Sequence, residues 1–228
     1  MIRTTLLASA VAFAATGAAA SLINFETPAT GGGAAGSVGS NSLTVGDVTF
    51  TSNGDLAIAE VGDPLEGFVN DTLEDDTPND PGALGTFFLT TALRKTSVLD
   101  IDYANPVSGL NFDLVDIDGS QINQPEQFVI RFFDENDVEL VGLAKTFTGD
   151  TGNPDTGDGV LTNVSVSSMT LIGRVSIEGT RPTGTADVGI AFDNFDVDSP
   201  APIPLPAGLP LLAGGLGAMA WLRRRQRG

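Results

Sequence analysis

The residues of this sequence best suited to chemistry are carboxylates placed near turns. One pair lies at opposite ends of the chain: Glu26 follows Asn24 and Phe25, and Asp193 precedes Asn194 in the segment 191–195. The first and last strands of a jelly roll commonly lie side by side, so we expect Glu26 and Asp193 to share a Ca²⁺ site, because Ca²⁺ selects hard oxygen ligands. The alternative interpretation is that Asp193 and Asn194 cap or bulge the last strand.

A second group of carboxylates contains Asp116 and Asp118, directly before Gly119. Asp-x-Asp-Gly resembles the middle of an EF-hand loop, in which a glycine at the sixth position allows a sharp turn. With Gly119 at the sixth position, however, the first and twelfth positions fall on Leu114 and Pro125, which cannot supply the required carboxylates. A Ca²⁺ loop of another type, held by Asp116 and Asp118, and a simple acidic turn both stay open.

A third group, Glu135, Asp137 and Glu139, has the alternating spacing that places three side chains on one face of a strand. Two carboxylates so arranged serve as nucleophile and acid in glycoside hydrolysis, which makes a carboxylate-based polysaccharide hydrolase one alternative function. The group lies between two apolar arms among residues that form turns, so a hairpin turn is the favoured interpretation. The Gly/Asp-rich segment 149–159 is expected to be a rim loop.

The composition excludes several kinds of chemistry. The 228 residues include no histidine and no cysteine, which excludes imidazole acid–base catalysis, thiol nucleophiles and disulfides. Residues 21–199 carry all 29 acidic residues and six basic ones, a net charge of −23 that repels nucleic acid. The one tyrosine there is Tyr103, and the one tryptophan, Trp221, is in the tail. Few aromatic platforms are therefore available for a polysaccharide.

Short runs with a period of two dominate residues 21–199, and turn residues separate these runs. Their spacing predicts about ten antiparallel strands, each with one buried face. We therefore expect one all-β domain, a two-sheet antiparallel β-sandwich of the jelly-roll type. The expected strands cover 43–50, 56–61, 86–91, 98–103, 110–114, 128–132, 175–177 and 190–192.

The two ends of this domain resemble carbohydrate-binding jelly rolls, which have a glutamate in an early strand and a Phe-Asp-Asn segment in a late one. Glu26 and Phe192-Asp193-Asn194 are the matching residues here. The resemblance implies a structural Ca²⁺ and suggests a Ca²⁺-dependent glycan-binding module as an alternative function.

The N-terminus has the features of a secretory signal peptide. Arg3 supplies a positive charge, residues 6–13 are apolar, and Ala18 and Ala20 are the small residues that signal peptidase requires. Residues 1–20 are therefore expected to be removed, so that the exported protein begins at Ser21.

The C-terminus has three consecutive parts. A Pro-rich linker and motif at 200–208 precede an apolar segment at 209–222, which is expected to be a short transmembrane helix, and a basic cytoplasmic tail at 223–228. The arginines of this tail, which stay on the cytoplasmic side and stop the segment in the membrane, are Arg223, Arg224, Arg225 and Arg227.

This arrangement resembles the PEP-CTERM class of exported bacterial proteins, in the variant whose motif reads Val-Pro-Leu-Pro-Ala. The corresponding residues are Ile203, Pro204, Leu205, Pro206 and Ala207. The resemblance implies insertion into the inner membrane, cleavage by an exosortase-type membrane enzyme, and delivery to the cell surface or extracellular matrix.

The sequence thus predicts an exported, sorted protein with a non-catalytic β-sandwich. No cofactor is expected except a structural Ca²⁺, and extracellular polysaccharide is the candidate partner besides the processing enzyme.

Overall fold

The structure is a computed structural model, and it describes most of the expected β-domain. The described residues are 22–28, 31–32, 36–61, 65–68, 85–117, 125–149, 157–182 and 187–198. The expected signal peptide, the segments from 200 to 228, and Asp118 lie outside them. The described part of the chain contains no helix with the length and apolarity that a bilayer span requires.

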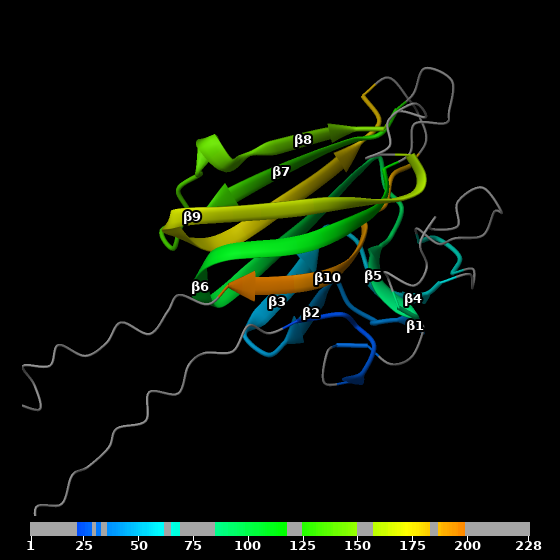
Figure 1. The fold of residues 1–228 in the computed structure, drawn as a ribbon. Coiled ribbons are helices and arrows are strands. Elements are labelled where there is room, and N and C mark those ends of the chain that lie inside the picture. The colour runs from blue at the N-terminus through cyan, green and yellow to red at the C-terminus, as the bar shows by residue number, and fades with distance from the viewer. Residues whose placement is uncertain are drawn as a thin grey trace, which may run out of the picture. The chain divides into compact units, whose positions relative to one another are not determined.

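The described residues form ten strands in antiparallel pairing (Figure 1). The all-β prediction is confirmed. Between β7 and β8 the described residues also form a 3₁₀ turn, η2 (Val141–Leu143). The strands are β1 (Gly36–Ser37), β2 (Ser42–Val45), β3 (Val48–Ser52), β4 (Leu56–Glu60), β5 (Phe87–Thr91), β6 (Thr96–Ile117), β7 (Gln127–Phe133), β8 (Lys145–Thr148), β9 (Gly157–Thr180) and β10 (Ala191–Asp198).

Four features of the strands differ from the prediction. The run 43–50 is a hairpin of β2 and β3, because Gly46 has a φ of 59° and supplies a two-residue turn between Val45 and Val48. The runs at 98–103 and 110–114 belong to one strand, β6, which continues through Pro106. Strand β9 begins at Gly157, inside the segment expected to be a loop, and β8 was not predicted.

Strands β6 and β9 are long because each belongs to both halves of the sheet. Their mutual register is interrupted between Asp102 and Gly109 on β6, opposite the segment 167–174 of β9. Before the break, β6 pairs with β3, and the last part of β9 pairs with β7. After the break, β6 pairs with β10. The breaks thus divide the pairing into two half-sheets, in the orders β2-β3-β6-β9-β7-β8 and β1-β4-β5-β10-β6-β9.

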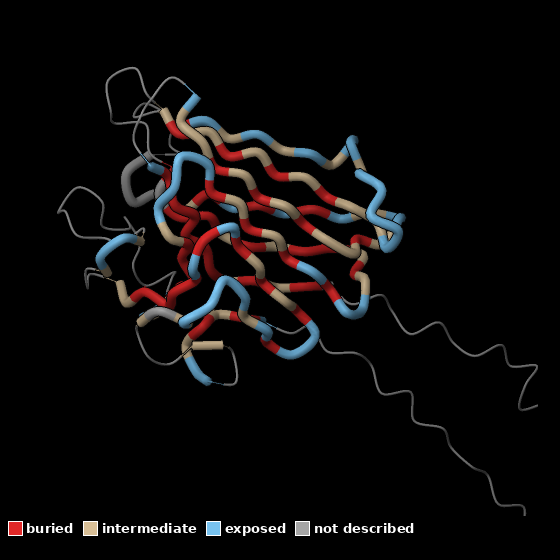
Figure 2. The backbone as a smooth tube through the Cα atoms, turned by 180° about the vertical axis from the view of Figure 1, so that it is seen from behind, coloured by how far each residue is buried: buried red, intermediate tan, exposed pale blue. Residues whose placement is uncertain are grey.

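The two half-sheets enclose one core, which makes the fold a β-sandwich. Leu99 and Ile101 from the first half of β6 and Phe112 and Leu114 from the second half belong to the same buried cluster. Along β7, buried and partly exposed residues alternate without exception, as a strand with one buried face requires. Figure 2 shows this alternation along several strands.

An aromatic group fills the centre of the core. Phe50, Phe192 and Phe195 lie with ring centroids 5.5 to 6.4 Å apart. Phe25 contacts Phe50 and Phe192 edge-on, at 5.8 Å each. Such edge-to-face pairs add to the stabilisation that comes from burial. Phe25 therefore fixes the N-terminal segment to the core and holds the next residue, Glu26, in place.

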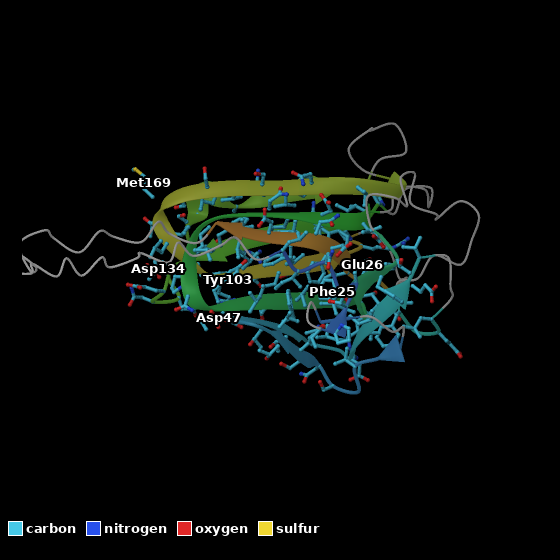
Figure 3. The ribbon with its side chains drawn as sticks, turned by 60° about the horizontal axis from the view of Figure 1, so that its bottom comes forward. Phe25, Glu26, Asp47, Tyr103, Asp134 and Met169 are labelled. Atoms are coloured by element: carbon cyan, nitrogen blue, oxygen red, sulfur yellow. The ribbon has the colours of Figure 1, made fainter. Side chains whose placement is uncertain are left out.

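Several turns lie together at what we call the bend end of the sandwich. The β2–β3 turn ends at Val48, which pairs with Tyr103 where β6 bends. Arg174, after the bend in β9, pairs with Phe133 at the end of β7. Figure 3 shows Asp47, Tyr103, Asp134 and Met169 at this end, away from Phe25 and Glu26.

Candidate functional site

The candidate site is a fully buried carboxylate on β10. Asp193 has 0 % of its surface exposed, and neither carboxylate oxygen has a hydrogen-bond partner of good geometry among the described groups, although the backbone N–H of Asn194 lies near enough to influence the carboxylate. The pKa of Asp193 is raised from 3.8 to about 8; burial is the largest cause, the backbone N–H of Asn194 opposes it, and the negative charges of Glu26 and Asp113 add to it. An unpaired buried charge is costly, so proteins usually pair such a group or bind a metal with it.

A bulge in β10 places Asp193 there. The pairing of β10 with β6 shifts between Asp193 and Asp196, and Asn194 takes a left-handed φ of 53°. The bulge predicted as the alternative role of Asp193 and Asn194 is therefore present, and it accompanies the burial of the carboxylate. Bulges commonly re-aim a side chain at functional sites, and left-handed backbone at a non-glycine residue stores strain there.

The N-terminal segment runs along the same bulge. Ile23 pairs with Phe195 through two backbone hydrogen bonds of 2.7 and 2.9 Å. Phe25, like Asn194, has a left-handed φ, of 54°. The first and last segments of the domain thus lie side by side, as the sequence predicted, and Glu26 is close enough to Asp193 to raise its pKa.

Glu26 is held by the backbone at the start of β5. Its Oε1 accepts hydrogen bonds from the backbone N–H groups of Thr86, at 2.7 Å, and Phe87, at 3.0 Å. Gly85 has a φ of 71°, and a Cβ atom there would lie 2.2 Å from Oε1 of Glu26, so only glycine fits. These contacts leave Oε2 of Glu26 available to a ligand.

Asp113, on β6, is the third carboxylate near Asp193. In the sequence it stands at the start of the group that contains Asp116 and Asp118, and sequence reasoning did not place it beside Asp193. It lies opposite Asp193 in the strand register. The side-chain amide of Asn163 donates to one oxygen of Asp113 at 2.7 Å, and that of Asn194 donates to the other at 3.0 Å. Asp113 is thus already hydrogen-bonded, and its main effect on Asp193 is electrostatic. Only the register of β6 against β10 reveals this proximity.

The predicted Ca²⁺ loop at Asp116 and Asp118 is only partly described by the structure. Asp116 lies near the end of β6, and its partner Asp118 is outside the described residues. The described residues contain no group of three or more acidic side chains placed to hold a metal. A cation at Asp193 would therefore take its remaining ligands from backbone carbonyl groups and water, which Ca²⁺ accepts.

The hairpin turn predicted after Phe133 is present. Oδ1 of Asp134 accepts hydrogen bonds from the backbone N–H groups of Asn136, at 2.8 Å, and Val138, at 2.9 Å, which lowers the pKa of Asp134. Asp137 has a left-handed φ of 62°. Because the segment turns, Glu135 and Glu139 do not share a strand face in the way a nucleophile–acid pair would need.

A second feature is an open hollow at the bend end, with a volume of about 470 Å³. Arg174 forms ion pairs there with Asp100, at 3.1 Å, and Asp137, at 2.6 Å, and lies 3.8 Å above the ring of Phe133. Partial burial raises the pKa of Asp102, with Arg174 opposing the shift. The hollow's charged and aromatic lining residues are Asp102, Tyr103, Asp134, Glu135, Asp137 and Arg174.

Comparison with known proteins gives only distant similarities in structure. No family model matches the chain, and no curated protein matches its sequence. The lectin domain of lectinolysin in complex with Lewis b antigen is 15% identical, with a TM-score of 0.34, over 65% of this chain and 94% of that one.

Two further solved structures have similarly low sequence identity and TM-score. TmCBM61 in complex with β-1,4-galactotriose is 10% identical, with a TM-score of 0.34, over 66% of this chain and 88% of that one. The K2 cleaved adhesin domain of Lys-gingipain is 12% identical, with a TM-score of 0.38, over 80% and 99%. The neighbours include carbohydrate-binding modules and a lectin domain, but similarity at this level carries no argument about function. Fold and site together define an all-β antiparallel sandwich with a buried acidic site.

Proposed function

We propose that this chain is an exported, non-catalytic surface or matrix protein whose β-sandwich is stabilised by bound Ca²⁺. The observation that carries the cation proposal is Asp193, whose two oxygens are buried without a partner. A divalent cation would take the place of the proton that Asp193 otherwise holds, and it would balance the negative charge of Glu26. The hard carboxylate oxygens favour Ca²⁺ over softer metals.

The ligands proposed for the cation are Asp193, through one or both oxygens, and Glu26, through the oxygen that the β5 backbone leaves available. Asp113 would strengthen the negative field without direct coordination, since both of its oxygens accept hydrogen bonds from asparagines. The role of the ion would be structural: it would join the N-terminal segment to the bulge of β10.

The test is the unfolding of the full-length chain by urea, with EDTA or with Ca²⁺ at matched ionic strength. At 100 times its Kd, an ion that binds only the folded state adds about 2.7 kcal/mol. Asp193→Asn should abolish this gain, whereas the control Asp196→Asn, on the same strand, should retain it. Equal stability of the wild-type chain in EDTA and in Ca²⁺ would refute the proposal.

Glycan binding is the second candidate function, and the hollow around Arg174 favours it. Its volume lies in the range of ligand pockets, and a few fixed polar groups are what orient a polar ligand. The hollow offers Asp102 and Asp137 as acceptors and Arg174 as a donor.

Pull-down with extracellular polysaccharide tests this candidate. Arg174→Ala should reduce the bound fraction, and Arg131→Ala, which removes an arginine outside the hollow, should leave it unchanged. Equal binding by both variants would exclude the hollow as the glycan site. Because Glu26 and the hollow lie apart (Figure 3), EDTA should reduce binding only to the extent that it unfolds the protein.

Export and sorting are proposed from the sequence motifs. Signal peptidase would cut after Ala20, and an exosortase-type enzyme would recognise the motif from Ile203 to Ala207 and cut near it. Intact-mass measurement of the surface-released protein tests both steps. A species that begins at Ser21 and lacks Trp221 is expected. A released species that retains Met1 would contradict the first step, and one that retains Arg223 would contradict the second.

A further inference from the structure

The outer edge of β9 differs from the other edges of the two half-sheets. The other edge strands are short: β1 has two residues, and β2 and β8 have four each. Proteins commonly protect sheet edges by keeping them short or by placing lysine on them, and β8 begins with Lys145. The first part of β9 pairs with β6 on one side, and no described strand pairs with its other side between Asn163 and Ser167.

This edge lacks the usual protection against pairing with another strand. From Leu161 to Gly173 the sequence has no charged residue and no proline, in a chain whose net charge is −18. Asn163, Ser165 and Ser167 are exposed, and Met169 is fully exposed, at 105%. Figure 1 shows this part of β9 as a long band beside β6. Long, uncharged edges are the ones that accept another strand.

Between Leu161 and Met169, the sequence of this edge is similar when read in either direction. If two copies pair antiparallel about Ser165, each residue faces one of similar chemistry. Val164 faces Val166 of the second copy, Asn163 faces Ser167, and Leu161 faces Met169. The last pair would cover the exposed methionine. No facing pair joins two carboxylates, although like charges are abundant elsewhere on this acidic chain.

We propose that the edge of β9 is a homodimer interface, at which two copies join their half-sheets through antiparallel β9–β9 pairing. A two-fold axis at Ser165 makes the contact self-complementary and closed, so it produces dimers and not open fibres. The interface adjoins the acidic surroundings of Asp193, because Asn163 also donates a hydrogen bond to Asp113, whereas Ser165 is not among the residues that line the hollow around Arg174.

Because the chain has no cysteine, Ser165→Cys introduces a single thiol. Facing Cα atoms in an antiparallel pair are about 4.5–5.5 Å apart, within the range that a disulfide spans. Under mild oxidation, full-length Ser165→Cys should form a covalent dimer. The control Thr44→Cys, exposed on the edge strand β2, should stay monomeric. Equal cross-linking of the two variants would overturn the proposal.

Sedimentation of the uncross-linked chain gives an independent readout. The wild-type chain should have twice the monomer mass, and Ser165→Lys should have the monomer mass, because two ammonium groups would face each other across the axis. Circular dichroism of Ser165→Lys should match that of the wild-type chain, since residue 165 is exposed. A monomeric wild-type chain, or a dimer that persists in folded Ser165→Lys, would overturn the proposal.

Discussion

Two buried carboxylates in this sandwich have opposite surroundings. Glu126 has a side chain 7% exposed, and it accepts hydrogen bonds from Arg181 at 2.9 and 3.2 Å. Asp193 is fully buried, and no cationic side chain of the described residues pairs with it. A buried carboxylate needs a compensating cation or a proton. Glu126 obtains its cation from the chain, whereas Asp193 must hold a proton or take an ion from solution.

The largest change in the free energy of unfolding should come from raising the pH in the absence of divalent cations. The pKa of Asp193 is about 8 in the folded chain, against 3.8 for an aspartate free of these surroundings, the value expected when the chain unfolds. Between these values the unfolded chain has lost the proton and the folded chain retains it, so stability falls as pH rises through this window. The loss from this group should be on the order of 5 kcal/mol.

Urea unfolding in EDTA at pH 4 to 8 measures this loss. Asp193→Asn should remove most of the slope, whereas Asp196→Asn should preserve it. If Asp193→Asn and the wild-type chain show the same pH dependence, Asp193 does not carry the raised pKa.

Breaking the buried ion pair of Glu126 and Arg181 should give the next largest change in the free energy of unfolding. Arg181→Met removes the cation and keeps an apolar side chain of similar length, so the buried carboxylate of Glu126 loses the cationic partner that balances its charge. The expected loss of unfolding free energy is about 3–5 kcal/mol. The double variant Glu126→Gln/Arg181→Met should recover much of it. If Arg181→Met alone lowers the unfolding free energy by less than about 1 kcal/mol, this pair contributes no more than an exposed surface ion pair, and the prediction is wrong.

Arg174 should show an intermediate effect. Its side chain is 24% exposed, and it contacts Asp100, Asp137 and the ring of Phe133. Arg174→Ala should cost about 1–2 kcal/mol in unfolding free energy, because these contacts are partly screened by solvent. If Arg174→Ala lowers the unfolding free energy as much as Arg181→Met does, then partial exposure to solvent does not weaken the contacts of Arg174, and the prediction is wrong.

The smallest effect should come from the exposed pair of Arg131 and Glu178, which are 3.4 Å apart with more than a third of each side chain exposed. Glu178→Gln should change the unfolding free energy by less than about 1 kcal/mol. Raising the salt concentration should shrink this difference further. A larger change that persists in high salt would contradict the screening on which this ranking depends.

Local patterns in the sequence were sufficient for most strands and their buried faces, but not for β8 or the first part of β9. The alternation of Phe128, Ile130 and Phe132 predicted β7, because the strand period depends only on neighbouring residues. The turn after Phe133 was predicted for the same reason. The continuity of β6 through Pro106 was not predicted, because proline usually interrupts a strand, and only the pairing with both β9 and β10 reveals it.

The candidate site was partly predictable. Glu26 and Asp193 were paired by reasoning about where the first and last strands of a jelly roll lie, and the Ile23–Phe195 bridge confirms that these segments are adjacent. The sequence by itself thus determined most of the strands, the acidic charge and the two candidate ligands. Only the tertiary structure decided that Asp193 is buried without a partner and lies opposite Asp113, because burial and register arise from contacts between residues far apart in the chain.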